Sequence, residues 1–178
     1  MQCKLDLLIS REVIDETVAR LADRITDDYR GRSLVAVGIL KGAFIFMADL
    51  VRQIDIPLEI DFVMVSSYGN RTESSRCITL VNDLTIDVGG KDVLLIEDIV
   101  DSGHTVSYVV DHLRSRGART VRLCALADKP SRRETSVAID YVGFTVPDKF
   151  VVGYGLDFDG RFRYLPDIYC VEERNEPE

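Results

Sequence analysis

The sequence predicts an α/β fold built on a mostly parallel β-sheet. Two observations support this prediction. Short apolar runs of strand length alternate along the chain with segments whose apolar residues recur at helical spacing. The chain has 178 residues, enough for one substantial core, and it contains no repeat, low-complexity linker or clear domain boundary. We therefore expect a single domain over residues 1–178, with right-handed crossovers between parallel strands.

The first part of the chain predicts the order strand, helix, strand, helix. Residues 4–10 (KLDLLIS) have the composition of a short strand, and Ser10 can cap the helix after it. The apolar residues of that helix fall on one face: Ile14, Val18, Leu21 and Ile25. The β-branched run at 33–40 (SLVAVGIL) predicts a buried strand. Residues 43–54 (AFIFMADLVRQI) predict the second helix.

The middle of the chain predicts a strand pair around a loop, then a strand and a helix. Strands are expected at 58–67 and 77–81. The polar, glycine-containing stretch at about 67–76 between them lacks periodicity and predicts a mobile loop. The apolar run at 93–96 predicts a buried strand, and Gly117 suits the end of the helix after it. That helix has one apolar face: Val106, Val109, Val110 and Leu113.

The last third of the chain predicts strands with little helix. Apolar runs of strand length occur at 120–127 (TVRLCALA) and 139–144 (IDYVGF). Two more occur at 150–158 (FVVGYGLDF) and 167–171 (DIYCV), and the second closes the fold. The tail that follows, EERNEPE, is charged and is expected to fray.

Composition excludes several classes of function. Net charge is −8, from 22 basic and 30 acidic residues, which disfavours general affinity for nucleic acid or an anionic membrane. Four scattered cysteines without C-x-x-C spacing could form two disulfides, but free thiols are the favoured interpretation, and zinc is disfavoured. The N-terminus lacks the apolar core of a signal peptide, and no apolar run is long enough to span a membrane. A cytoplasmic location is the resulting expectation.

Charged residues follow three of the predicted strands. Lys41-Gly42 follows the second strand, and Asp128-Lys129 follows the run at 120–127. Glu97, Asp98 and Asp101 follow the apolar run at 93–96. In open α/β sheets, ligands bind beyond the carboxyl ends of the strands. One shared site at that edge is therefore the prediction.

The segment after 93–96 is suited to a phosphorylated sugar. The turn at 101–105 (DSGHT) precedes a helix, so its backbone N–H groups and hydroxyls can surround a phosphate, although a plain N-cap would also explain it. Glu97 and Asp98 repel each other and resist desolvation, so they need hydroxyl donors, a cation or both. A ribose diol with Mg²⁺ supplies both.

The thirteen residues VLLIEDIVDSGHT, at 93–105, resemble the ribose-phosphate-binding motif of type I phosphoribosyltransferases. Further segments resemble the hypoxanthine-guanine branch of that family in the same order: LKG at 40–42, SSYG at 66–69, DKPSRR at 128–133, PDKFVVGYGLDF at 147–158, and Arg163. The resemblance implies the type I fold, a twisted and mostly parallel sheet flanked by helices with a small hood from the N- and C-terminal segments. It also implies a homodimer or homotetramer.

The resemblance implies a purine salvage reaction. Hypoxanthine or guanine would attack C1 of 5-phosphoribosyl 1-diphosphate, giving IMP or GMP and diphosphate, with Mg²⁺ required. Asp101 matches the group that accepts the proton from purine N7. Glu97 and Asp98 would hold the ribose hydroxyls and Mg²⁺. The 5′-phosphate would be surrounded by Ser102, Gly103, His104 and Thr105, although His104 departs from the Lys or Asn common in relatives.

The remaining expected contacts rest on the resemblance alone. The diphosphate would be bound by Lys41, Gly42, Ser67, Tyr68 and Arg163, and the peptide before Lys41 is often cis in relatives. The purine would be bound by Lys129 at its 6-oxygen, by stacking on Phe150 and by the Val151 backbone. Asp157 would lie near the base, the diphosphate and a second Mg²⁺, although it could also be a turn residue.

Two other classes of function stay open at this point. A regulator could keep this fold and bind nucleic acid in response to purine or phosphoribosyl diphosphate. The net charge of −8 and the intact set of Asp101, Lys129, Phe150 and Asp157 stand against it. An enzyme of the same fold acting on another base is the third possibility.

Overall fold

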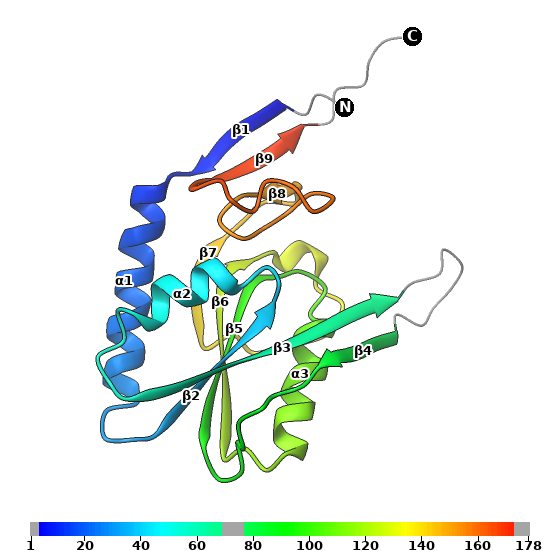
Figure 1. Cartoon of the computed structure of the whole chain (residues 1–178). Coiled ribbons are helices and arrows are strands. Elements are labelled where there is room, and N and C mark those ends of the chain that lie inside the picture. Colours follow the sequence, from blue (N-terminus) through cyan, green and yellow to red (C-terminus); the bar gives the residue numbers. More distant parts are fainter. Residues whose placement is uncertain (1–3, 69–76, 173–178) are drawn as a thin grey trace.

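A six-stranded sheet forms the centre of the protein (Figure 1). The computed structural model describes residues 4–68 and 77–172. The elements, in chain order, are β1 (Lys4–Ile9), α1 (Arg11–Asp28), β2 (Leu34–Leu40), α2 (Phe44–Val51), β3 (Leu58–Tyr68), β4 (Cys77–Asn82), β5 (Asp92–Val100), α3 (His104–Ser115), β6 (Thr120–Asp128), the 3₁₀ turn η1 (Pro130–Arg132), β7 (Tyr141–Thr145), β8 (Val151–Val152) and β9 (Ile168–Glu172).

The strand order of the large sheet is β4-β3-β2-β5-β6-β7. All neighbours are parallel except β3 and β4, which pair antiparallel. From β2 the chain proceeds to β3 on one side, whereas from β5 it proceeds to β6 and β7 on the other. The strand order therefore reverses between β2 and β5, and such a switch point is where α/β sheets bind ligands.

Alternating side chains of the strands build a core on each face of the sheet. On β5, Leu94 and Ile96 join the core that contains Ile14 and Val18 of α1. Val93 and Leu95 point the other way and join the core of α3. Both faces of β5 are thus apolar, as the continuous run at 93–96 predicts.

A second, antiparallel sheet of order β1-β9-β8 forms the hood (Figure 1). It brings the N- and C-terminal segments side by side, in register from Lys4 opposite Glu172 to Ile9 opposite Ile168. The Asp167 carboxylate accepts the N–H of Arg11 at 2.7 Å, and the Tyr154 hydroxyl donates to Asp49 on α2 at 2.7 Å. These bonds join the hood to both helices of one core face.

Three details of the sequence prediction were wrong. Glu97 and Asp98 do not follow a strand, because β5 continues through both residues to Val100. The predicted strand at 150–158 is a strand only over Val151–Val152. Ser10 occupies the N-cap position of α1, but its hydroxyl makes no capping bond there; Asp167 supplies the acceptor instead.

Other expectations agree with the structure. α3 ends in a turn where Gly117 has φ +84° and the Ala118 N–H reaches the Leu113 carbonyl at 3.2 Å. Cys124 and Cys170 are buried free thiols. None of the helices within residues 4–68 and 77–172 is long and apolar enough to cross a membrane. Most of the loop expected at 67–76 lies outside the described residues.

Candidate functional site

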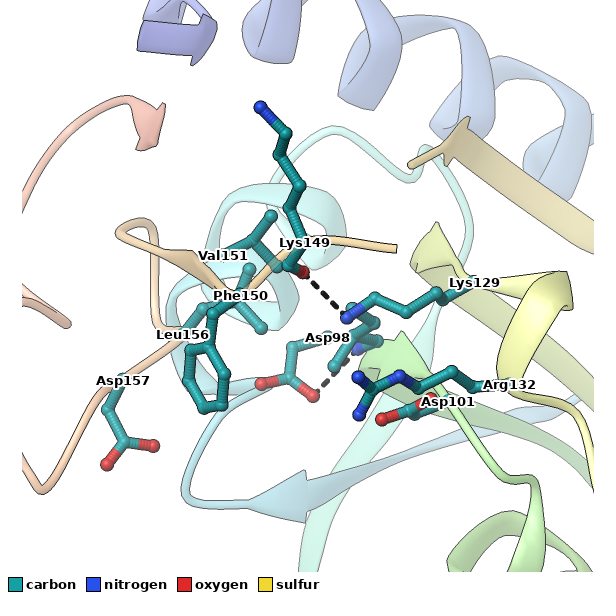
Figure 2. Close-up of a pocket in the computed structure, with 10 residues that line it drawn as sticks. Asp98, Asp101, Lys129, Arg132, Lys149, Phe150, Val151, Leu156 and Asp157 are labelled. Atoms are coloured by element: carbon teal, nitrogen blue, oxygen red, sulfur yellow. Dashed lines mark hydrogen bonds between the residues drawn. The ribbon is translucent and has the colours of Figure 1, made fainter. Parts of the chain in front are cut away.

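A cavity of about 190 Å³ lies between the carboxyl ends of the central strands and the hood (Figure 2). One wall belongs to the large sheet and the loop after β6, and includes Asp98, Asp101 and Lys129. The other wall belongs to the segment that leads through β8, and includes Phe150, Val151 and Asp157. Six residues singled out from the sequence thus surround one space.

A smaller cavity of about 70 Å³ adjoins the turn before α3. Its lining includes Glu97, Asp101, Ser102, Gly103 and Thr105. Asp101 lines both cavities. Asp101 therefore borders both the space beside the turn and the space under the hood.

The turn at 101–105 has the geometry of an anion-binding loop. Gly103 is the N-cap of α3 with φ +88°, a backbone conformation that side chains rarely adopt. A Cβ on Gly103 would also lie 2.6 Å from the Thr135 carbonyl oxygen. The N-terminus of α3 carries a partial positive charge toward this cavity, so an anion there is stabilised.

Glu97 and Asp98 lie on opposite sides of β5, and each faces a different cavity. Burial, and then the neighbouring charge of Asp98, raise the pKa of Glu97 well above its usual range. Burial raises the pKa of Asp98 to about 6, although the Ile99 N–H and Arg163 act in the opposite direction. Buried oxygens of Glu97 (Oε2) and Asp101 (Oδ1) have no hydrogen-bond partner within the described structure. Such atoms are suited to a ligand that supplies donors or a cation.

The loop after β2 packs directly against Asp98. The Leu40–Lys41 peptide is cis, as the resemblance implies. A Cβ on Gly42 would lie 1.7 Å from Asp98 Oδ2, so a larger residue would force the loop or the carboxylate to move. A Cβ on Gly155 would lie 2.2 Å from the Gly42 carbonyl oxygen. Gly42 is therefore packed between Asp98 of β5 and Gly155 of the segment after β8.

Lys129 is a buried cation, with only 5% of its surface exposed. Its ammonium donates to the Lys149 carbonyl at 2.9 Å across the cavity (Figure 2). An ammonium has three donors, so the remaining ones are available to a molecule in the cavity. The sequence alone would treat this lysine as a surface residue.

Phe150 and Val151 form an apolar part of the hood wall. Phe150 is 54% exposed, and its ring meets Phe158 edge-on with centroids 5.1 Å apart. Val151 is buried in β8, where it pairs with Cys170 of β9. An exposed aromatic face beside a cavity can stack on a planar ring.

Asp157 and Arg163 form an ion pair at 2.6 Å. Arg163 also donates to the Gly155 carbonyl at 2.6 Å, whereas Arg161 is exposed. Asp157 accepts the Gly160 N–H at 2.8 Å, so it has the turn role as well as a place in the cavity wall. Its partners leave it less available to a ligand than Glu97.

Several predicted residues are not brought into direct contact with the cavities. Lys41 is exposed at the end of β2. Ser67 and Tyr68 end β3, and their side chains are outside the described part of the chain. The His104 ring contacts the Glu134 carboxylate at 2.7 Å and the Thr135 hydroxyl at 2.8 Å. That partnership directs His104 toward the loop after β6.

Known proteins resemble this chain over nearly its full length. A model described as the phosphoribosyl transferase domain matches residues 10–159. The chain belongs to the phosphoribosyl transferase family. This membership confirms the resemblance of the 93–105 motif, and the observed sheet, helices and hood are the fold that the resemblance implies.

Three relatives define the match to this phosphoribosyl transferase more closely. The bifunctional protein TilS/HprT of Listeria innocua is 51% identical over 162 residues, which are 91% of this chain but only 25% of that longer protein. The hypoxanthine-guanine phosphoribosyltransferase of Bacillus subtilis is 50% identical over 162 residues, 91% of this chain and 90% of the relative. The crystal structure of a hypoxanthine-guanine phosphoribosyltransferase from Bacillus anthracis matches with a TM-score of 0.91 at 42% identity, covering 96% of this chain and 100% of the other.

Sequence reasoning assigned no role to Arg133, which the structure places beside this phosphoribosyl transferase's turn. Its guanidinium donates to the carbonyls of Val100 and Asp101 at 3.2 and 3.1 Å. Only its position in DKPSRR, one residue after another arginine, was visible in the sequence. Nothing in that pattern distinguishes it from the exposed Arg132.

Proposed function

We propose that this protein transfers the 5-phosphoribosyl group from 5-phosphoribosyl 1-diphosphate to hypoxanthine or guanine. The products are IMP or GMP and diphosphate. One observation carries the proposal: Asp101, the first residue of the anion-binding turn, lines both the cavity beside that turn and the cavity that contains Lys129 and Phe150. A carboxylate in that position can serve a sugar phosphate on one side and a base on the other.

The turn at 101–105 binds the 5′-phosphate in this proposal. The N–H groups at the start of α3 and the hydroxyls of Ser102 and Thr105 donate to the phosphate oxygens, and Gly103 permits the close approach. The backbone carries most of this binding. His104 contributes through its position on the main chain, because its ring is bonded to Glu134 and Thr135.

Asp101 acts as the general base. As purine N9 attacks C1 of the ribose, positive charge develops on the base, and Asp101 accepts the proton from N7. Its buried Oδ1 has no hydrogen-bond partner within the described residues, which leaves it ready to accept one. Such a base accelerates a reaction by about 10²–10⁴-fold.

Glu97 and Asp98 hold the ribose hydroxyls. The two carboxylates extend from opposite sides of β5, Glu97 toward the smaller cavity and Asp98 toward the larger one. Glu97 is buried and Asp98 is half-buried, and both have raised pKa values, so the folded protein without substrate disfavours their charges. Hydroxyl donors and a cation would reverse that penalty. The loose, positively charged sugar of the transition state would also be stabilised by these carboxylates.

Mg²⁺ fits this donor set as a cation that arrives with the substrate. Among the described residues, no group of three His, Cys, Asp or Glu side chains could hold a metal ion. Glu97 and Asp98, with Asp157 at a second position, would supply only part of a coordination shell, and substrate oxygens would complete it. When bound, Mg²⁺ neutralises the charge of the diphosphate leaving group.

The base binds under the hood. Lys129 donates to the 6-oxygen, the Val151 carbonyl accepts the purine N1–H, and Phe150 stacks on the ring. Donor and acceptor then match a 6-oxopurine. Adenine has the opposite pattern, since its amino group would face the ammonium.

The diphosphate binds along the loop after β2. Gly42 lies beside Asp98, Lys41 immediately precedes it, and Arg163 reaches the same wall through its pair with Asp157. Ser67 and Tyr68 complete this set at the end of β3. The side chains of these last two are assigned from the resemblance alone.

We also propose that residues 1–178 act as one unit, and that copies of the chain associate as a homodimer or homotetramer. Light scattering coupled to size-exclusion chromatography tests the association. The net charge of −8 disfavours nucleic acid as a partner.

The experiment is an assay with hypoxanthine, 5-phosphoribosyl 1-diphosphate and Mg²⁺, with products separated by chromatography. IMP and diphosphate are expected in equal amounts, and guanine should give GMP. If neither base is converted, the proposed reaction is wrong. Purine-dependent binding to DNA without turnover would instead favour the regulator.

A further inference from the structure

We infer that Arg133 is a positioning residue for phosphoribosyl transfer, an inference that rests on the proposed function. Arg133 belongs to the loop after β6 and holds the main chain that carries Asp101. It acts on the general base through the backbone, so a change at Arg133 is expected to affect the chemical step more than substrate binding.

The Arg133 guanidinium joins the ends of two neighbouring strands. Nε donates to the Asp101 carbonyl at 3.1 Å, and Nη2 donates to the Val100 carbonyl at 3.2 Å. Nη2 also forms an ion pair with the Asp128 carboxylate at the end of β6. The side chain is only 18% exposed. A planar guanidinium can reach two successive carbonyls and a carboxylate together, whereas a lysine ammonium is a single point charge.

The residues after Arg133 fix the rest of the turn. The N–H groups of Glu134 and Thr135 both donate to the Ser102 carbonyl, at 3.0 and 2.9 Å. The His104 ring bonds to the same two residues. Gly103 packs so closely that an added Cβ would lie 2.6 Å from the Thr135 carbonyl. Residues 133–135 thus contact every residue from Asp101 to His104.

The backbone has to orient Asp101 because the carboxylate lacks another anchor at one oxygen. Oδ1 is buried and has no hydrogen-bond partner within the described part of the chain. The position from which that side chain extends depends on the main chain of Val100 and Asp101, whose carbonyls accept hydrogen bonds from Arg133. A misplacement of about 1 Å can cost about 10²-fold in rate.

Two substitutions separate charge from geometry. Arg133→Met removes the whole contact, and Arg133→Lys keeps a positive charge near Asp128 but cannot span both carbonyls. Both variants should slow the single-turnover rate at saturating substrates by about 10–100-fold. The KM for hypoxanthine should stay within about threefold, because Lys129 and Phe150 are untouched.

Arg119→Met is the matched control. Asp92 is the first residue of the same strand, β5, and is buried. The Arg119 guanidinium donates to its two carboxylate oxygens at 2.9 and 2.6 Å. Its removal should lower Tm but leave the single-turnover rate within about threefold. All rates are measured at a temperature at which circular dichroism shows every variant fully folded.

The outcomes are distinct. A wild-type rate in Arg133→Lys would overturn the positioning role, and so would an equal loss of rate in Arg119→Met. If Arg133→Met does not fold, the lysine variant decides alone. Absence of IMP formation by the wild-type protein would refute the proposed function itself, whereas an active wild type with fully active Arg133 variants would refute only the inference about Arg133.

Discussion

Asp98 is the residue whose titration the fold changes in a way that unfolding experiments can measure. An ordinary aspartate titrates near 3.8, whereas burial raises the pKa of Asp98 to about 6. Between these pH values the folded protein binds more protons than the unfolded chain, so the free energy of unfolding falls as pH rises through this window. The stabilising protonated form is fully present below pH 3.8 and is lost as pH passes 6.

Asp98→Asn should therefore stabilise the ligand-free protein at pH 8 by roughly 1–3 kcal/mol and have little effect at pH 4. The amide cannot ionise, so no buried charge forms at high pH. Urea unfolding at both pH values, without Mg²⁺ or substrate, measures the difference. Asp111→Asn on the exposed face of α3 is the control. Equal effects of Asp98→Asn at both pH values would contradict the burial of this charge.

Asp101→Asn should slow the chemical step by about 10²–10⁴-fold and leave binding of 5-phosphoribosyl 1-diphosphate within a few fold. The amide keeps the shape of the carboxyl group but cannot accept the N7 proton. Single-turnover kinetics and equilibrium binding measure the two quantities separately. A rate loss of less than about threefold at saturation would remove Asp101 from the role of general base.

The loop after β2 packs so closely against Asp98 that an added side chain there should disturb both stability and binding. Gly42→Ala should raise the KM for 5-phosphoribosyl 1-diphosphate and destabilise the protein by about 1–3 kcal/mol. A Cβ would lie 1.7 Å from Asp98 Oδ2, so the loop or the carboxylate has to move. Unfolding and steady-state kinetics measure both effects.

Gly89→Ala is the control for that prediction. The three atoms nearest to its Cβ would belong to the exposed Asp87 side chain, the closest at 3.2 Å. Like Gly42, Gly89 has no positive φ, so neither substitution introduces backbone strain of that kind. A wild-type KM in Gly42→Ala would show that the loop does not shape the diphosphate site.

Most elements were predictable from periodicity, and the errors have physical causes. The β-branched and apolar runs of β2, β5 and β6 are buried on both faces, which makes their signal strong. The end of β5 was missed because glutamate and aspartate side chains are rarely buried in a strand, so Glu97 and Asp98 looked like residues that follow one. The segment 150–158 has apolar composition but turns at Gly153, Tyr154 and Gly155, all with positive φ.

The contacts around the turn could not be derived from composition or spacing. Arg133 and Thr135 reach it from a different strand connection. Pairing between distant segments leaves no periodic signal. The roles of Lys41, Lys129 and Phe150 came from the resemblance alone.

At the scale of the whole molecule, the cavity that contains Lys129 and Phe150 depends on the contacts that hold the hood against the core. Tyr154→Phe removes the 2.7 Å hydrogen bond to Asp49 and should destabilise the protein by about 1–3 kcal/mol. The KM for the base should rise, since Val151 and Phe150 belong to the same hood wall. Thermal unfolding and steady-state kinetics test this. Tyr164→Phe is the control, because Tyr164 is 79% exposed. An unchanged Tm in Tyr154→Phe would mean that the bond does not anchor the hood.

The hood was expected only from the resemblance. β1 and β9 lie at opposite ends of the chain, and neither strand contains a signal that specifies its partner or register. The large sheet follows more directly from the sequence, because alternating strands and helices imply parallel neighbours. The position of the site at the reversal between β2 and β5 requires the strand order as well.

The ratio of kcat/KM for hypoxanthine and adenine tests the central claim most directly: that a phosphoribosyl group is transferred to a 6-oxopurine held between Lys129 and Val151. Adenine mismatches both polar contacts, at roughly 1–3 kcal/mol each, so hypoxanthine should be preferred by about 10²–10⁴-fold. Guanine should behave like hypoxanthine, and Lys129→Gln should reduce the preference. Adenine used within about tenfold of hypoxanthine at the same Mg²⁺ concentration would contradict the claim.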